Sequence, residues 1–235
     1  MITGILVALP EELHTLSKFK IKQGECSPVS KNILVTLSGS GPDNASNATH
    51  LLINRGAKQL ISWGCAGALA PYLKAGDLII PELIETRENK QLATDTFWSE
   101  LIVTTLQQCI KCYTGKIVES GSVVALAQDK AEQYQQTGAL AIDMESAAVA
   151  RIAQQANIPF VAIRSIADPA NLDLPKAISF AMTDTGVISI ARLMKYICIH
   201  PTEIPALIKL GFNFNAASKT LKQAAIHLPQ ITQVQ

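Results

Sequence analysis

The chain has 235 residues, 48% of them hydrophobic and 17% charged, and its 20 basic and 19 acidic residues give a formal net charge of +1. This balance excludes the strong basic bias typical of nucleic-acid-binding proteins. No apolar stretch reaches the ~20 residues that span a membrane. The 5 scattered cysteines are odd in number, which favours a reducing cytoplasm over a disulfide framework.

Short apolar runs alternate with longer helical patterns along the chain, as they do in α/β proteins. Strands are predicted at residues 2–9, 32–37, 59–63, 78–84, 116–118, 122–125, 140–143 and 159–166. Helices are predicted at residues 45–53, 96–112, 129–136, 145–155 and 184–199. We therefore expect an α/β fold, a single three-layer α/β/α domain with a central mixed, largely parallel sheet.

A helical tail is expected to follow this domain. His200 and Pro201 mark the boundary, so we assign residues 1–199 to the α/β domain and residues 200–235 to a helical C-terminal extension. One helical stripe of the tail is apolar and contains Leu207, Leu210, Phe214, Ala217, Leu221 and Ala224. The charged residues from position 195 onward are four lysines and one glutamate. A basic amphipathic helix predicts peripheral contact with an anionic membrane, and packing on the protein's own body or on a dimer partner is the alternative.

Three carboxylates follow predicted strands. Residues 140–168 have the length of a strand–helix–strand crossover, which predicts two parallel strands ending just before Glu145 and Asp168. Glu12 follows the first strand, and the glycine-containing segment 64–67 follows another. Ligands of open α/β sheets bind at the carboxyl ends of the strands, so we expect these three acids to surround a glycine-lined floor. Each acid taken alone also fits a helix start or a turn.

Several segments resemble a known enzyme family. Residues 4–12, 38–41, 64–71, 74–77, 142–148 and 160–168 resemble, in this order, segments of the methylthioadenosine/S-adenosylhomocysteine nucleosidases. The match covers most of residues 1–190 and indicates the nucleoside phosphorylase/nucleosidase superfamily. Residues 142–150, 167–170 and 200–208 are most similar to the hopanoid-associated phosphorylases. That resemblance implies the release of adenine from a 5′-substituted adenosine, adenosylhopane-like, in hopanoid metabolism.

The resemblance also implies roles for individual residues. Asp168 would protonate purine N7, Glu145 would hold the ribose hydroxyls, and Glu12, helped by Arg164, would deprotonate an attacking water. Substrate binding is expected from Asp143, Met144, Cys65, Ala66, Gly67, Val124 and Ala125.

A cytoplasmic homodimer that binds a small purine nucleoside is expected, without cofactor, metal or nucleic acid. The segment between Glu85 and Trp98 is shorter than in the nucleosidases, so an open 5′ side would suit a bulky, lipid-like group.

Alternatives remain open at this point. The stretch Ser38, Gly39, Ser40 and Gly41 precedes a helix, where backbone N–H groups could bind an anion such as phosphate; its other interpretation is a tight turn. Phosphorolytic relatives hold phosphate with an arginine and a serine, and residues 62–65, Ser-Trp-Gly-Cys, have neither in the corresponding places, which favours water over phosphate as the acceptor. A methylthioadenosine/S-adenosylhomocysteine nucleosidase and a catalytically inactive nucleoside-binding module are the competing functions.

Overall fold

The computed structural model describes residues 1–17, 20–181 and 190–233. Its strands are β1 (Thr3–Val7), β2 (Cys26–Ser30), β3 (Ile33–Leu37), β4 (Gln59–Ala68), β5 (Leu78–Glu85), β6 (Gln91–Ala93), β7 (Cys112–Glu119), β8 (Ala141–Asp143) and β9 (Phe160–Asp168). Its helices are α1 (Pro10–Leu16), α2 (Pro42–Asn54), α3 (Thr96–Leu106), α4 (Ala127–Thr137), α5 (Ser146–Ala156), α6 (Lys176–Ala181), α7 (Ile190–Ile199), the 3₁₀ turn Pro201–Glu203, α8 (Ile204–Ala225) and α9 (Leu228–Ile231).

The strands form one mixed sheet in the order β2-β3-β1-β4-β8-β7-β5-β6, and β9 pairs with both β4 and β5. Parallel pairings join β1 to β3 and β4, β4 to β9, and β7 to β5 and β8. Because β4 contacts β8 and β9, while β5 contacts β7 and β9, five strands close into a ring. The sheet is therefore a small distorted barrel, with β1, β3 and β2 continuing from one side.

The ring corrects the prediction that the strands before Glu145 and Asp168 are parallel. β8 is antiparallel to β4 and β9 is parallel to β4, so β8 and β9 run in opposite directions. The physical reason is the length of β4. Its last residues, Gly67 and Ala68, extend beyond β1 and pair with β8.

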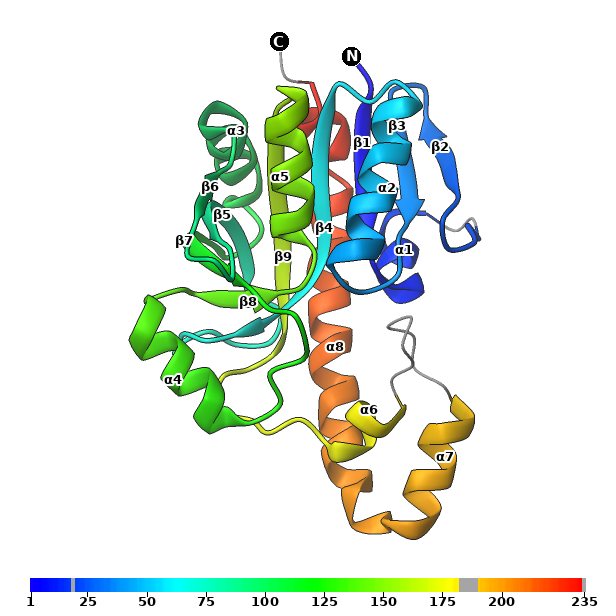
Figure 1. The fold of residues 1–235 in the computed structure, drawn as a ribbon, viewed down its shortest axis with the longest axis vertical. Helices are drawn as coiled ribbons and strands as arrows, with labels where there is room; N and C mark the ends of the chain where they lie inside the picture. Colours follow the sequence, from blue (N-terminus) through cyan, green and yellow to red (C-terminus); the bar gives the residue numbers. More distant parts are fainter. Residues whose placement is uncertain (18–19, 182–189, 234–235) are drawn as a thin grey trace.

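Helices cover both faces of the sheet and confirm the three-layer architecture (Figure 1). Along β1, Leu6 belongs to a core cluster that includes side chains of α2 and α5. Ile5 and Val7 belong to a second cluster, with side chains of α1, α3, α8 and α9. This alternation is the period of two expected of a strand that is buried on both faces.

Several local predictions need correction. Residues 64–67, expected to follow a strand that ends at residue 63, lie inside β4. The predicted helix 96–112 ends at Leu106, because Cys112 already begins β7, and residues 122–125 form no strand. β2 and β6 were not predicted from the sequence. Residues 184–189 of the predicted helix 184–199 lie outside the described residues, and α7 covers the remainder.

The predicted apolar stripe of the tail packs on the protein's own body along the C-terminal half of α8. Ala217, Leu221 and Ala224 are buried, and the Trp98 indole donates a 2.5 Å hydrogen bond to the Ile231 carbonyl. In Figure 1 the N-terminal half of α8 projects with α6 and α7 away from the two chain termini. The boundary at residue 200 stays a prediction, although residues far beyond it belong to the core.

Leu221→Ala tests this packing. Leu221 is fully buried, and a Leu→Ala change at such a site costs about 2–5 kcal/mol through lost burial and the cavity left behind. We expect a loss of this size in the free energy of unfolding, measured by urea denaturation. Ile208→Ala is the control, because Ile208 is 55% exposed and surface changes stay within about 0.5 kcal/mol. Equal stability of both variants would contradict the assignment of α8 to the core.

Candidate active site

Glu12 is held by the backbone at the junction of β1 and α1. Pro10 occupies the first helical position, which its fixed φ angle favours, and Glu12 lies in the first turn. The Glu12 carboxylate accepts hydrogen bonds from the N–H groups of Ala8 and Leu9, both at 3.0 Å. It also accepts the N–H of Cys65 in β4 at 2.7 Å. A side chain that sequence places in an ordinary helix start is thus buried against the sheet.

This contact requires a glycine in β4. A Cβ atom on Gly64 would lie 2.5 Å from Oε1 of Glu12, well inside van der Waals contact. Trp63 holds the helix from the same strand: its Nε1 donates to the Thr15 hydroxyl at 2.9 Å, and that hydroxyl donates to the Glu12 carbonyl at 2.6 Å. The absence of a side chain at residue 64 therefore permits the close approach of the Glu12 carboxylate to β4.

Glu145 lies directly before α5 and reaches the start of α2. Its Oε1 accepts the Gly41 N–H at 2.9 Å, which places a carboxylate at the positive end of that helix. Gly41 has a φ of +98° and Gly39 a φ of +83°, values that favour glycine. The Ser38 hydroxyl donates to the Val7 and Gly39 carbonyls at 3.2 and 2.8 Å. The anion that the Ser38–Gly41 segment binds in this structure is therefore the protein's own Glu145.

Arg164 is the buried cation of this cluster. Its Nε donates to Oδ2 of Asp143 at 2.6 Å, and its Nη2 donates to the Ser62 hydroxyl at 2.6 Å. Asp143 also accepts from the N–H and hydroxyl of Ser146. Asp143, predicted to bind substrate, thus points its carboxylate into the protein, where it orients Arg164.

Burial shifts the proton affinities of these acids. Burial, together with the neighbouring Asp143 charge, raises the pKa of Glu145 to about 7, against the lowering effects of Arg164 and the Gly41 N–H. Burial likewise raises the pKa of Glu12, against the opposing effects of Arg164 and the three backbone N–H groups. Acids poised near neutral pH can exchange protons during a reaction.

Asp168 belongs to a second charged group. It ends β9, and its Oδ2 lies 2.7 Å from Nζ of Lys130, a fully buried side chain of α4. Burial raises the pKa of Asp168, while the Lys130 charge lowers it. Lys130 was not predicted as a site residue. A single lysine in a polar helix does not indicate burial, and its partner Asp168 is 38 positions away in the chain.

The two charged groups lie along one strand. Glu12 packs against Gly64, and Oδ2 of Asp168 would lie 3.4 Å from a Cβ on Gly67. Three residues of strand span ~10 Å, so the two carboxylates lie at separate points along β4. The structure thus places the three predicted acids in two groups along β4. Asp168 lies at one end, and Glu12 and Glu145 lie at the other.

The other predicted residues lie beside this strand. Ala66 is buried, and Val124 packs against a cluster that contains Leu69 and Ile142. Ala125 accepts the Leu174 N–H at 2.8 Å, and Met144 is half-buried next to Glu145. Burial and the Glu12 charge raise the pKa of the Cys65 thiol, which therefore stays neutral.

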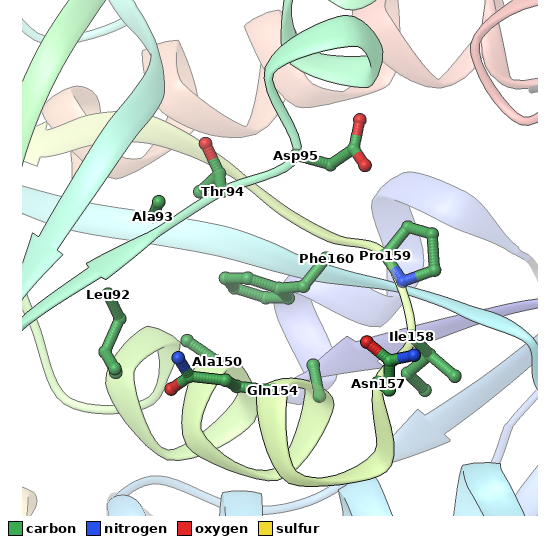
Figure 2. Close-up of a pocket in the computed structure, with 11 residues that line it drawn as sticks. Leu92, Ala93, Thr94, Asp95, Ala150, Gln154, Asn157, Ile158, Pro159 and Phe160 are labelled. Carbon is green, nitrogen blue, oxygen red and sulfur yellow. The ribbon is translucent and has the colours of Figure 1, made fainter.

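A pocket of about 360 Å³ lies elsewhere on the described surface, between the start of α3 and the C-terminal end of α5 (Figure 2). Leu92 and Phe160 are among its lining residues, with Asp95 and Asn157 at its edge. It includes none of the predicted site residues. Among the described residues, no group of three or more His, Cys, Asp or Glu side chains is arranged to hold a metal ion.

Gly64→Ala tests the seat of Glu12. The added methyl group would displace the movable carboxylate, and its buried N–H donors would lose their acceptor, which costs about 1–3 kcal/mol. We expect a corresponding fall in the free energy of unfolding by urea titration. Gly211→Ala is the control, since a Cβ there meets nothing within 4 Å and the helix gains up to about 1 kcal/mol. Unchanged stability of Gly64→Ala would contradict this geometry.

Comparison with known proteins shows the family of this chain. The family model of the phosphorylase superfamily matches residues 3–194. A 5′-methylthioadenosine/S-adenosylhomocysteine nucleosidase of Staphylococcus saprophyticus is 30% identical over 200 residues, covering 72% of this chain and 87% of that protein. Its counterpart from Staphylococcus aureus strain JH9 is 27% identical over 197 residues, covering 72% and 86%.

Solved structures share the fold. S-adenosylhomocysteine nucleosidase from Streptococcus pyogenes superposes with a TM-score of 0.72 at 20% identity, covering 100% of this chain and 98% of that chain. Futalosine hydrolase of Helicobacter pylori gives a TM-score of 0.70 at 19% identity, covering 98% and 96%. With the family match over most of its length, this chain is an enzyme of the phosphorylase superfamily.

Proposed function

We propose that this enzyme hydrolyses the N-glycosidic bond of a 5′-substituted adenosine and releases adenine. The observation that carries the proposal is the separation of two acidic groups along β4, Asp168 at Gly67 and Glu12 at Gly64. Loss of a purine from ribose needs an acid at the base and a nucleophile at the sugar. The relatives that match this chain are nucleosidases by name, which supports the same reaction class.

Each acid has a distinct part in this mechanism. Asp168, protonated at the start, donates its proton to N7 as the bond between C1′ and N9 breaks and its electron pair moves to the base. Glu145 accepts hydrogen bonds from the ribose hydroxyls, and Met144 packs beside the sugar. Glu12 takes a proton from the water that attacks C1′. Arg164, fixed by Asp143 and Ser62, offsets the charge of these carboxylates.

Water is favoured over phosphate as the acceptor. The backbone donors that would receive a phosphate are already bound to carboxylates, Gly41 to Glu145 and Cys65 to Glu12. A phosphate dianion there would meet like charge in a buried site, which disfavours it strongly. The Arg164 guanidinium donates to Asp143, to Ser62 and, at 3.4 Å, to the Ile163 carbonyl, so it is oriented by groups of the protein.

The 5′ substituent has two candidates. The curated relatives favour methylthioadenosine and S-adenosylhomocysteine. An adenosylhopane-like nucleoside, with a bulky apolar group, is favoured by the exposed apolar surface of the projecting helices. This surface consists of Phe180, Met194, Ile199, Ile204, Ile208 and Phe212, with exposed fractions from 40% to 68%. On that ground we propose the lipid-linked substrate and hopanoid metabolism as the setting.

The same surface carries the proposal of peripheral membrane contact. It differs from the stripe predicted from sequence, because that stripe contributes to the core and a neighbouring face of α8 is exposed. Lys195 and Lys209 are exposed beside it and would favour anionic lipid. In the described part of the chain, no helix is long and apolar enough to cross a membrane. A cytoplasmic homodimer, in contact with the inner face of the membrane, completes the proposal.

The acceptor is tested by product analysis. The purified enzyme is incubated with methylthioadenosine with and without 50-fold molar excess of phosphate over substrate, and adenine and the sugar product are separated chromatographically. We expect free sugar at the same rate in both, because the backbone donors hold carboxylates. A sugar 1-phosphate that forms only with phosphate would contradict hydrolysis. Tight binding of all nucleosides tested without adenine release would instead indicate an inactive binding module.

The 5′ group is tested with a series of 5′-alkylthioadenosines of increasing chain length. If the substituent occupies an apolar environment, kcat/KM rises by up to about fourfold for each added methylene, which corresponds to ~0.8 kcal/mol. Adding anionic vesicles should raise the rate for the longest chain, and Phe212→Ser should remove that increase. Ile226→Ser is the matched control, because Ile226 is also an exposed apolar residue (74%) but lies at the C-terminal end of α8. Highest kcat/KM for the methylthio compound, unaffected by vesicles, would favour the nucleosidase alternative.

A further inference from the structure

Lys130 is buried where a lysine is unusual. It is the one buried residue of α4, and its side chain is 0% exposed. Lysine is almost never fully buried unless it is paired, and the cost of removing its charge from water must be offset locally. The residue therefore has a partner that justifies its position, and that partner is Asp168.

The ammonium group has a complete set of acceptors. Nζ lies 2.7 Å from Oδ2 of Asp168 and donates to the Leu172 and Pro169 carbonyls at 2.8 and 3.3 Å. Lysine has three N–H donors and no acceptor, so these contacts fix its charge in one place. One acceptor is the last residue of β9, and the other two belong to the short segment that follows it.

Among the described residues, Lys130 is the charged side chain that acts on Asp168. The neighbouring residues of β4 and β8, Gly67 and Ile142, are uncharged. The Asp173 carboxylate accepts the Ala127 N–H at 2.7 Å. Within this part of the chain, Asp168 therefore meets the Lys130 cation in a largely buried setting.

We propose that Lys130 is a positioning residue that makes Asp168 an effective proton donor to the leaving base. This inference rests on the proposed function. When Asp168 transfers its proton to N7, a carboxylate forms 2.7 Å from the Lys130 ammonium, and the attraction stabilises the product of the transfer. Lys130 keeps its own protons throughout. The remaining contacts hold the segment after β9, so that the Asp168 carboxyl stays in place.

Burial and the Lys130 charge have opposite effects on the pKa of Asp168. Burial raises its pKa, so it retains a proton near neutral pH, and the Lys130 charge lowers its pKa, so it can release that proton. A cation close to a carboxylate lowers the carboxyl pKa by about 1–3 units. Without Lys130, Asp168 would hold its proton to higher pH and donate it less readily.

The test compares Lys130→Gln and Lys130→Met with the unaltered enzyme. Glutamine can still donate to the Leu172 and Pro169 carbonyls but carries no charge, whereas methionine loses both. The pH profile of kcat/KM for adenine release from methylthioadenosine is measured from pH 5 to pH 10. We expect the alkaline limb of both variants to move up by at least about one pH unit. The plateau should fall by at least about tenfold, since a general acid contributes 10²- to 10⁴-fold.

Three further enzymes separate the possible outcomes. Lys116→Met removes an ion pair with Glu85 away from Asp168 and should keep the unaltered profile. Lys130→Gln added to Asp168→Asn should lower the rate no further than Asp168→Asn alone. A Lys130→Gln profile equal to the unaltered one, or failure of both Lys130 variants to fold, would overturn the proposal in favour of a structural role. Full activity of Asp168→Asn would instead overturn the proposed function.

Discussion

The close contact between the Glu12 carboxylate and the backbone of β4 is the constraint on which the rest of the site depends. It joins the β1–α1 junction to the middle of the sheet through the Cys65 N–H, and it is possible only because residue 64 lacks a side chain. A buried carboxylate without donors would be costly. Here three backbone N–H groups donate to Glu12, which offsets the free-energy cost of burying its carboxylate and fixes its orientation.

From this contact the charges divide into two groups with different tasks. Glu12, Asp143 and Glu145 surround Arg164, and their mutual interactions, together with burial, hold the pKa of Glu145 near 7. Within the described part of the chain, the charge that acts on Asp168 is that of Lys130. In the proposed mechanism, this separation along β4 lets Asp168 retain a proton for the base while Glu12 accepts one from water. The N–H groups of Gly41 and Cys65 are occupied by the Glu145 and Glu12 carboxylates.

Much of this could be predicted from local patterns. The glycines near Ser38 predicted the turn before α2, whereas α1 was not among the predicted helices. The ordered resemblance identified the superfamily, and it named the acids that we propose for the site. Residues 64–67 were expected to follow a strand that ends at residue 63, because glycine usually interrupts a strand. In this strand, glycine instead admits Glu12 at position 64 and Asp168 at position 67.

Other features depend on long-range closure, which a single sequence does not encode locally. The opposite directions of β8 and β9 follow from the extension of β4 past β1. The burial of Lys130 depends on the path of the chain after Asp168. The exposed face of α8 differs from the predicted stripe because the body covers the C-terminal half of that helix and not its N-terminal half.

The most direct test of the central claim is a crystal structure with a non-cleavable adenosine analogue, such as one with a C-nucleoside bond. The account predicts that purine N7 lies within hydrogen-bond distance of Asp168, with the ribose hydroxyls on Glu145 and a water between Glu12 and C1′. An analogue bound with its base against Glu12, or with Asp168 turned away from the ligand, would contradict it.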